Sequence, residues 1–370
     1  MYVNSIYLKN YKNYKEENIS FNKYVNIIYG DNAQGKTNLI ESIYLLSYGR
    51  TFKGPINSNI VNFENEDTYL KVDFFKNGRN QNIAFYHNKN DNKKYFKLNE
   101  IAQNKMSDLY GKINIVVYKP EDIDIIKKGP SIRRRYIDML ISSIKPMYIS
   151  LLSNYNTILK QRNYFLKNNK DIYFKDRNKI DRNYLEVLNT KLAEYANKIF
   201  IYRKKIIDEI NIIANEFHST IVKQKNESLS FKYKSTSETK EKLISLLNKY
   251  EYNDFMRGYT TYGIHRDDII IKINDLDITQ FGSQGQQKSS ILSLKLAECK
   301  IIEIETGEKP IILLDDFMSE LDKTRQKLFV ENIQDYQVFI TSTNKIIIDE
   351  RETKYIHIKN GKVLKVEENS

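Results

Sequence analysis

The residues best suited to chemistry in this chain form a glycine-rich loop near the N-terminus: Gly30, Asp31, Asn32, Ala33, Gln34, Gly35, Lys36 and Thr37. The loop has the spacing G-x4-G-K-T, and it lies between an apolar segment typical of a strand and a segment with helical periodicity. The N–H groups of such a loop converge at the positive end of the helix, where a phosphate binds. We therefore predict a nucleoside triphosphate site, with Lys36 on the β- and γ-phosphates and Thr37 on Mg²⁺. A glycine turn that matches by chance is the disfavoured alternative, because strand and helix both occupy the required places.

Two adjacent carboxylates, Asp315 and Asp316, follow the wholly apolar segment 310–314. Such a run is typical of a buried parallel strand, and acids at the carboxyl end of that strand lie where a Mg²⁺–nucleotide site forms. We expect Asp315 to help hold Mg²⁺ and Asp316 to polarise the attacking water. Capping of a following helix is the alternative for one of the two.

A second polar loop, which contains Ser283, Gly285 and Gln286, precedes a segment with helical periodicity. Serine and glycine at the start of a helix offer N–H groups and a hydroxyl to an anion. Loops of this composition are common, so the signal is weak alone. It gains weight because an acid-tipped strand follows.

Composition narrows the class of protein. The chain has 370 residues, 41% hydrophobic and 29% charged, which indicates a globular protein of two domains or of one domain with a large insertion. The formal charge of +12 favours a polyanionic partner, nucleic acid first, although a general abundance of lysine is the alternative. Cys299 alone excludes a disulfide framework and a zinc knuckle. No signal region or long apolar run is seen, so we expect a cytoplasmic protein without a membrane partner.

The elements that must position these residues come from both ends of the chain. Lys36 and Asp315 must touch one nucleotide, so residues 1–118 and 256–370 are expected to form one domain, with a mainly helical lobe, 119–255, inserted. The alternating segment Thr68–Phe75 and the turn signal Asn77-Gly78 predict an antiparallel β-meander. The fold class is therefore α/β: a mixed sheet with a phosphate loop, an antiparallel meander and an inserted helical lobe.

Within the lobe, apolar residues of the segment 188–206 recur at alternating intervals of four and three. This pattern indicates a buried stripe against a partner helix, for which Tyr148–Leu166 is the candidate, rather than a long coiled coil. The cluster Arg133–Arg135 either binds phosphate or forms a solvated face. His265 has no second metal ligand nearby and stays unassigned. The adjacent Asp267 and Asp268 would face opposite sides of a strand.

In these motifs the chain resembles the bacterial RecF family, small relatives of the SMC and Rad50 heads in the class of ABC-type ATPases. The resemblance covers nearly the whole length and is carried by Leu8–Tyr14, Gly30–Glu41, Lys119–Asp122, Gly129–Arg134, Gly263–Asp268, Gly282–Gln287 and Leu313–Asp322. Two positions depart from the pattern. Ala33 stands where many relatives have Gly, and Lys12 stands where Arg is usual, although Lys cannot make the forked contact of Arg.

The resemblance implies an ABC-type ATPase head that binds ATP and Mg²⁺, dimerises around two nucleotides, binds DNA and hydrolyses ATP slowly, as a switch. Ser283, with Gly285 and Gln286, would act on the nucleotide of the opposite subunit. RecF proteins act at gaps between single-stranded and duplex DNA, with RecO and RecR, in recombinase loading and the SOS response.

Other classes fit less well. A transporter ATPase subunit would be less basic and would need a membrane partner. An SMC or Rad50 protein would replace the middle third with a far longer heptad segment. A DNA-binding scaffold with a decayed ATPase is disfavoured because Lys36, Thr37, Asp315 and Asp316 are all intact.

Overall fold

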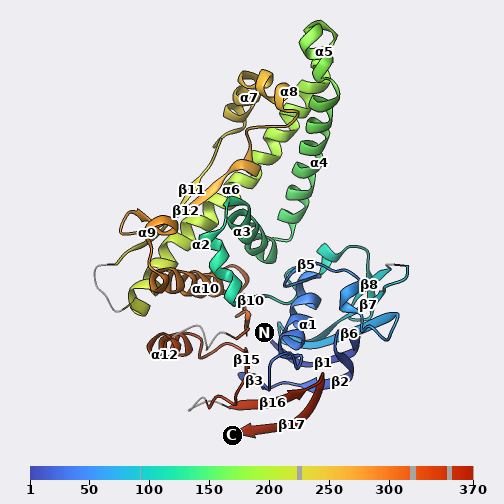
Figure 1. The fold of residues 1–370 in the computed structure, drawn as a ribbon, viewed down its shortest axis with the longest axis vertical. Coiled ribbons are helices and arrows are strands. Elements are labelled where there is room, and N and C mark those ends of the chain that lie inside the picture. The colour runs from blue at the N-terminus through green and yellow to red at the C-terminus, as the bar shows by residue number, and fades with distance from the viewer. Residues whose placement is uncertain (92, 223–226, 317–321, 348–351, 370) are drawn as a thin grey trace. The chain divides into compact units, whose positions relative to one another are not determined.

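The computed structural model describes residues 1–91, 93–222, 227–316, 322–347 and 352–369. The chain divides into two compact units (Figure 1). Unit 1 combines Met1–Ile123, Phe217–Lys225 and Lys288–Ser370, and unit 2 combines Asp124–Glu216 and Asn226–Gln287. Segments from both ends of the chain therefore build unit 1. The expected boundaries at 118/119 and 255/256 stay a prediction, but residues 256–287 pack with the helical unit rather than with unit 1.

A mixed sheet forms the centre of unit 1. Its order is β10-β14-β15-β3-β16-β17, and every neighbouring pair is parallel except β16–β17. The strands are β10 (Ile115–Tyr118), β14 (Ile311–Leu314), β15 (Val338–Ser342), β3 (Val25–Tyr29), β16 (Thr353–Lys359) and β17 (Lys362–Asn369). All residues of β10, β14 and β15 are buried, which agrees with the apolar runs of β10 and β14 and of β15 up to Ile340.

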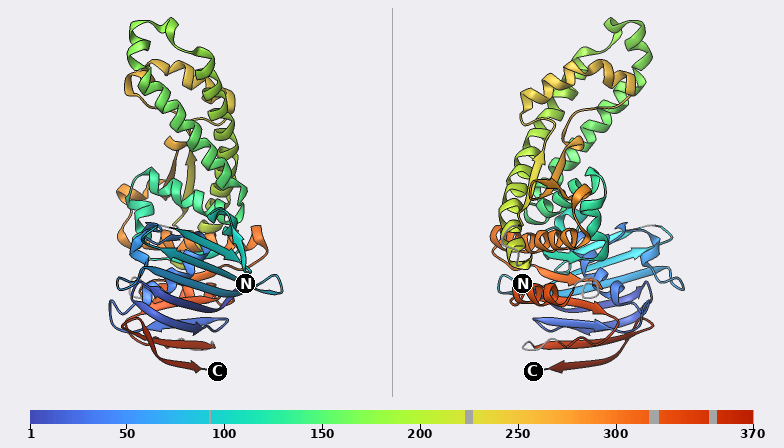
Figure 2. Two further views of the ribbon diagram at one scale, coloured as in Figure 1. Left: turned by 90° about the vertical axis from the view of Figure 1, so that its right-hand side faces the viewer. Right: turned by 60° about the vertical axis from the view of Figure 1, so that its left-hand side comes forward.

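The second sheet of unit 1 is antiparallel throughout, in the order β2-β1-β6-β7-β8-β9. Its strands, drawn in shades of blue in Figure 2, are β1 (Tyr2–Tyr11), β2 (Tyr14–Ser20), β6 (Asp67–Lys76), β7 (Arg79–Asn88), β8 (Lys94–Leu98) and β9 (Ile101–Gln103). Burial alternates along β6, as the sequence predicts for a half-buried strand. The expected meander is therefore confirmed.

In the described part of unit 1 the helices are α1 (Lys36–Tyr48), the end of α6 (Arg182–Val222), most of α10 (Gln284–Thr306) and α12 (Lys323–Asn332). Every residue of α1 from Leu39 to Tyr48 is buried. A helix that is buried all round needs neighbours on several faces, and α1 packs against strands of both sheets. Shorter elements lie between the main ones. They are the strands β4 (Arg50–Thr51) and β5 (Gly54–Pro55) and the short 3-10 helices η1 (Ser58–Ile60), η2 (Met106–Leu109) and η3 (Pro120–Ile123).

Unit 2 is mainly helical. It contains α2 (Asp124–Lys127), α3 (Pro130–Ile144), α4 (Met147–Asn168), α5 (Lys170–Lys175), η4 (Arg177–Lys179), most of α6 (Arg182–Val222), α7 (Lys240–Lys249), α8 (Glu251–Arg257), η5 (Ile264–Arg266) and α9 (Ile278–Phe281). A small antiparallel sheet joins β11 (Leu229–Lys234), β12 (Asp268–Ile273) and β13 (Leu276–Asp277). A mainly helical lobe was expected here, but the strand β11 was not predicted; its Leu229 and Phe231 alternate inward, and it pairs with β12.

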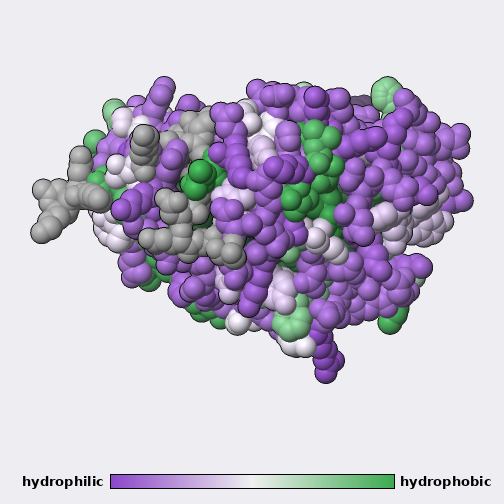
Figure 3. Space-filling view, turned by 90° about the horizontal axis from the view of Figure 1, so that it is seen from below, coloured by the Kyte–Doolittle hydropathy of each residue, from purple (hydrophilic) through white to green (hydrophobic). Residues whose placement is uncertain are grey.

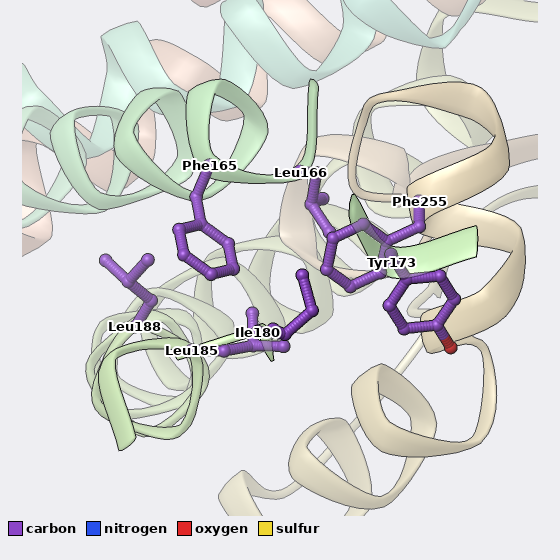
Figure 4. Packing of buried hydrophobic residues seen from close by; sticks show 7 residues of the cluster. All are labelled: Phe165, Leu166, Tyr173, Ile180, Leu185, Leu188 and Phe255. Atoms are coloured by element: carbon purple, nitrogen blue, oxygen red, sulfur yellow. The ribbon is translucent and has the colours of Figure 1, made fainter. Parts of the chain in front are cut away.

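The apolar stripe of α6 is buried, as expected, and α4 is its partner. Leu192 and Ile199 are fully buried, and the Tyr148 ring lies edge-on to that of Tyr202 at 5.5 Å between centroids. Further along the helix pair, a cluster of buried side chains joins α4, α5, α6 and α8 (Figure 4): Phe165, Leu166, Tyr173, Ile180, Leu185, Leu188 and Phe255. Stacking of Tyr173 on Phe255 at 3.9 Å ties α5 to α8.

The face drawn in Figure 3 is mostly hydrophilic and is interrupted by a narrow hydrophobic strip. Within the residues that the structure describes, no helix combines the length and the apolar character that a membrane crossing requires.

Candidate nucleotide-binding site

The glycine-rich loop connects β3 to α1, as predicted, and it uses left-handed backbone at three positions. Gly30, Ala33 and Gly35 have φ values of 146°, 64° and 114°. A Cβ on Gly30 would lie 2.3 Å from the carbonyl oxygen of Ile358, and one on Gly35 would lie 2.5 Å from Nδ2 of Asn13. Both glycines are therefore required by conformation and by space. Ala33 adopts its left-handed conformation at a cost of about 1 kcal/mol, so a methyl group is tolerated there.

Lys36 and Thr37 begin α1. The Lys36 side chain is buried and its Nζ donates to the carbonyl oxygens of Gly30 at 2.7 Å and Asp31 at 2.8 Å. The ammonium group thus lies within the curve of the loop. Thr37 Oγ1 donates to Oδ1 of Asp315 at 2.7 Å, so two predicted site residues that are 278 positions apart in the sequence meet.

Asp315 and Asp316 follow β14, which lies beside β15 in the sheet. Thr341 at the end of β15 donates its hydroxyl to Oδ1 of Asp315 at 2.8 Å and accepts from the backbone N–H of Asp316 at 2.9 Å. Burial raises the pKa of Asp315 and the charge of Asp316 adds to this, while the hydroxyls of Thr37 and Thr341 oppose it. A buried carboxylate of this kind gains from a nearby cation.

The donor set fits Mg²⁺ bound with a nucleotide. Among residues outside the gaps at 92, 223–226, 317–321, 348–351 and 370, no cluster of three His, Cys, Asp or Glu side chains forms a self-sufficient metal site. Mg²⁺ in phosphoryl-transfer sites uses one or two protein oxygens, substrate phosphates and water. Thr37 Oγ1 and Asp315 Oδ1 are such a pair of oxygens.

The capping alternative for the two acids is not supported for α12, because Asp322 caps that helix and accepts from the Arg325 N–H. The part of the acid-tipped motif at 317–321 lies outside the described residues.

Lys12, the other departure from the family pattern, contacts its partners through its one side-chain nitrogen. Its Nζ pairs with the buried carboxylate of Glu41 and donates to Oδ1 of Asn38 at 3.0 Å. Glu41 also accepts from the Phe52 N–H at 2.8 Å. A lysine therefore connects the turn between β1 and β2 to α1 without the forked geometry of arginine.

The serine loop belongs to unit 2, whereas the phosphate loop belongs to unit 1. Ser283 and Gln286 form a reciprocal capping box: Ser283 Oγ accepts from the Gln286 N–H at 3.2 Å, and Gln286 Oε1 accepts from the Ser283 N–H at 2.9 Å. Gly285 follows in the first turn of α10, and Ser283 is exposed. The action of this loop on a second subunit stays a prediction.

The basic cluster in unit 2 is structural in part. Arg133 makes a forked contact with Asp268 at 2.7 and 3.0 Å, and Arg134 donates to the carbonyl oxygen of Asp267 at 2.6 Å. The interpretation as a solvated face is therefore wrong for Arg133, which is buried, whereas phosphate binding by the cluster stays a prediction. Arg135 is exposed. Asp267 and Asp268 serve different partners, as expected for adjacent residues entering a strand.

His265 lies in the same region and is held from both sides. Its Nδ1 lies 2.7 Å from the Tyr155 hydroxyl and its Nε2 lies 3.1 Å from the Thr260 carbonyl oxygen. The carbonyl can only accept, so Nε2 carries the proton and Nδ1 accepts from Tyr155. The pKa of His265 is lowered from 6.5 to about 4, chiefly by burial; the charges of Arg266, Arg134 and Arg162 act in the same direction, and the hydrogen bond to Thr260 opposes them.

This lowered pKa predicts an acid-sensitive contribution to stability. The unfolded chain binds a proton at His265 below pH 6.5 and the folded chain only below about pH 4, so stability is lost as the pH falls through this window. Between about pH 7.5 and pH 5 we expect unfolding to become easier by roughly 2 kcal/mol. Urea unfolding at the two pH values measures the loss. The His265→Asn variant should show a smaller loss between them, and an unchanged loss would contradict the assignment.

Sequence reasoning missed Thr341, Asn13 and Asn38. Asn38 Nδ2 donates to Asn13 Oδ1 at 2.8 Å, and Asn13 Nδ2 donates to the Gln34 carbonyl oxygen at 2.9 Å. No spacing in the sequence signals these contacts, because they depend on which strands are neighbours. The position of Thr341 directly after an apolar strand was the one available clue.

Residues 2–364 match the family described as "RecF/RecN/SMC N terminal domain". A DNA replication and repair protein RecF from Clostridioides difficile is 38% identical over 379 residues, which cover 99% of each chain. The protein of that name from Acetivibrio thermocellus is 40% identical over 374 residues, 98% of this chain and 99% of the relative.

A solved structure of a recombination mediator protein RecF with ATP, described as part of the RecFOR pathway, is also similar. Its sequence is 36% identical to this chain and the TM-score is 0.88. The match covers 100% of this chain and 99% of that structure's chain. Similarity at this level extends over both compact units.

Proposed function

Because the chain belongs to the RecF family of DNA replication and repair proteins, we propose that it binds DNA in an ATP-dependent manner during recombinational repair. The observation that carries the proposal is the hydrogen bond of 2.7 Å between Thr37 and Asp315, which joins the phosphate loop to the acid-tipped strand. The similar RecF structure with ATP supports ATP as the nucleotide.

Within this proposal, the N–H groups of the loop Gly30–Thr37 bind the phosphates, and Lys36 turns its ammonium group from the loop carbonyls to the β- and γ-phosphates. Thr37 and Asp315 would hold Mg²⁺, which would neutralise phosphate charge. Asp316 acts on the attacking water. Hydrolysis is slow and serves as a switch, so the ATPase activity controls binding rather than metabolism.

ATP also completes a dimer in this proposal. Ser283, Gly285 and Gln286 act in trans, so that the nucleotide joins two subunits. The dimer clamps single-stranded DNA and gap junctions, and hydrolysis releases it. The formal charge of +12 supports a polyanionic partner. The same proposal includes contacts with RecR and RecO and an effect on recombinase loading and the SOS response. It also places the protein in the cytoplasm.

The alternative is an SMC/Rad50-like or transporter-type ABC ATPase subunit that is not dedicated to DNA gaps. The two proposals differ in whether DNA affinity responds to ATP and in whether gapped DNA is preferred over blunt duplex.

Sedimentation and DNA affinity, each with and without ATP–Mg²⁺, test the proposal. We expect ATP to shift the wild type to a dimer and to tighten binding of gapped DNA about tenfold or more. The Ser283→Arg variant should stay monomeric while still binding ATP, because a large cation at the loop blocks the interface. The Lys36→Arg variant should lose the response to ATP. A wild type that remains monomeric, with DNA affinity indifferent to ATP, would rule out the clamp and leave only the nucleotide site.

A further inference from the structure

The C-terminal hairpin, β16 and β17 with the turn Asn360–Gly361, contacts the phosphate loop at its first glycine. β16 pairs in parallel with β3, and His357 lies opposite Tyr29 at the end of the register. The two rings stack at 4.8 Å. The next residues along each strand are Ile358 and Gly30, and a Cβ on Gly30 would lie only 2.3 Å from the Ile358 carbonyl oxygen. The loop therefore begins in direct contact with the hairpin.

The turn of the hairpin makes a second contact, at the other end of the loop. The Gly361 N–H donates to the carbonyl oxygen of Gln34 at 2.9 Å. The Asn360 N–H donates to the side-chain Oε1 of the same Gln34 at 2.7 Å. Two consecutive N–H groups of the turn thus bind one loop residue.

Asn13, which lies between β1 and β2 of the antiparallel sheet, contacts both the loop and the hairpin turn. Its Nδ2 also donates to the Gln34 carbonyl oxygen, at 2.9 Å. A Cβ on Gly361 would lie 2.1 Å from the Asn13 carbonyl oxygen, and one on Gly35 would lie 2.5 Å from Asn13 Nδ2. A methyl group at Gly361 would clash with the Asn13 backbone, so the hairpin turn packs directly against the residue that also binds the loop.

The consequence concerns the direction of the peptide groups. A phosphate loop works because N–H groups point into the concavity, and a peptide group that turns its N–H inward must point its carbonyl away. The Gln34 carbonyl belongs to the peptide group whose N–H is that of Gly35. Three donors, from Asn13, Asn360 and Gly361, engage Gln34, and two of them hold its carbonyl.

From these contacts we propose that the turn Asn360–Gly361 is a positioning element of the nucleotide site. It holds the Gln34–Gly35 peptide in the orientation that receives phosphate, before the nucleotide arrives. Nucleotide affinity therefore depends on a hairpin more than three hundred residues away in the chain. The inference rests on the proposed function, since it concerns the same phosphate loop.

The chain contains a matched control for the test. The turn Asn77–Gly78 has the same two residues, with φ values of 51° and 73°, and Asn360–Gly361 has 51° and 69°. A Cβ on Gly78 meets nothing within 4 Å. Gly78→Ala and Gly361→Ala therefore introduce the same backbone strain, but only Gly361→Ala disturbs the contact with Asn13 and Gln34.

We expect Gly361→Ala to weaken binding of a fluorescent ATP analogue with Mg²⁺ about tenfold or more, and Gly78→Ala to change it less than about twofold. Thermal unfolding of both variants separates this effect from a general loss of stability. Hydrogen exchange of the loop amides without nucleotide should rise only in Gly361→Ala. Equal affinities of Gly361→Ala and the wild type would overturn the proposal.

A second variant decides the matter if Gly361→Ala does not fold. Gln34→Ala removes the acceptor of the Asn360 N–H and should weaken binding about threefold or more. Where Gly361→Ala does fold, the two losses should not add in the double variant, because both changes weaken the attachment of the turn to Gln34. An unchanged affinity in Gln34→Ala would contradict the proposal. A wild type that does not bind the analogue, or a Lys36→Ala variant that binds it equally well, would instead refute the nucleotide site itself.

Discussion

Replacement of Asp316 by Asn is expected to lower the rate of ATP hydrolysis at least about 100-fold and to leave ATP affinity within about threefold. Asp316 follows the buried strand β14 and has a left-handed backbone, with φ of 48°. Its N–H is anchored by the Thr341 hydroxyl at 2.9 Å, so the side chain starts from a fixed position. Asn has nearly the same size but lacks the negative charge that accepts a proton from water.

The measurement is a single-turnover rate with protein in excess over ATP, because turnover of a switch is slow. Asp315→Asn is the matched comparison. We expect it to raise the Mg²⁺ concentration needed for tight ATP binding, since Asp315 lies 2.7 Å from the Thr37 hydroxyl. If Asp316→Asn hydrolyses ATP at the wild-type rate, another group activates the water and the assignment of Asp316 is wrong.

Replacement of Arg162 by Met is expected to destabilise unit 2 by about 3–5 kcal/mol. The Arg162 side chain is fully buried, and its Nη1 donates to Oδ2 of Asp254 at 2.7 Å and to the Thr260 hydroxyl at 2.8 Å. Its Nε donates to Asn189 at 2.7 Å, which joins α4 to α6. Met fills similar volume but leaves the Asp254 carboxylate, which is 1% exposed, without its cation.

Arg182 provides the control. It contacts both oxygens of Glu251 at 2.7 and 2.8 Å, but its side chain is 49% exposed. Arg182→Met should therefore cost less than about 1 kcal/mol, because the half-exposed guanidinium is already solvated and the Glu251 carboxylate, 16% exposed, still reaches water when it loses its partner. Urea unfolding followed by circular dichroism compares the two variants. If both variants lose a similar free energy of unfolding, burial does not govern how much the Arg162–Asp254 pair contributes to stability.

Much of the fold and part of the site could be predicted because the relevant information is local. The phosphate loop needs only contiguous residues: an apolar strand, glycines where φ is positive, and a helix that begins at Lys36. Alternation along β6 and the Asn-Gly turns at 77–78 and 360–361 are likewise properties of short segments. The strand β11 was missed because it is short and is stabilised by pairing with β12, which lies far along the chain.

The sequence by itself determined the kind of chemistry, through the loop Gly30–Thr37 and the acids Asp315 and Asp316. Only the tertiary structure decided which groups meet: Thr37 with Asp315, Gln34 with the hairpin turn, and Arg133 with Asp268. The physical reason is that backbone conformation and periodicity are set by neighbours along the chain. Strand order, by contrast, is set by how apolar faces from distant segments bury one another, and it is this order that brings Asp315, Thr341 and the loop together.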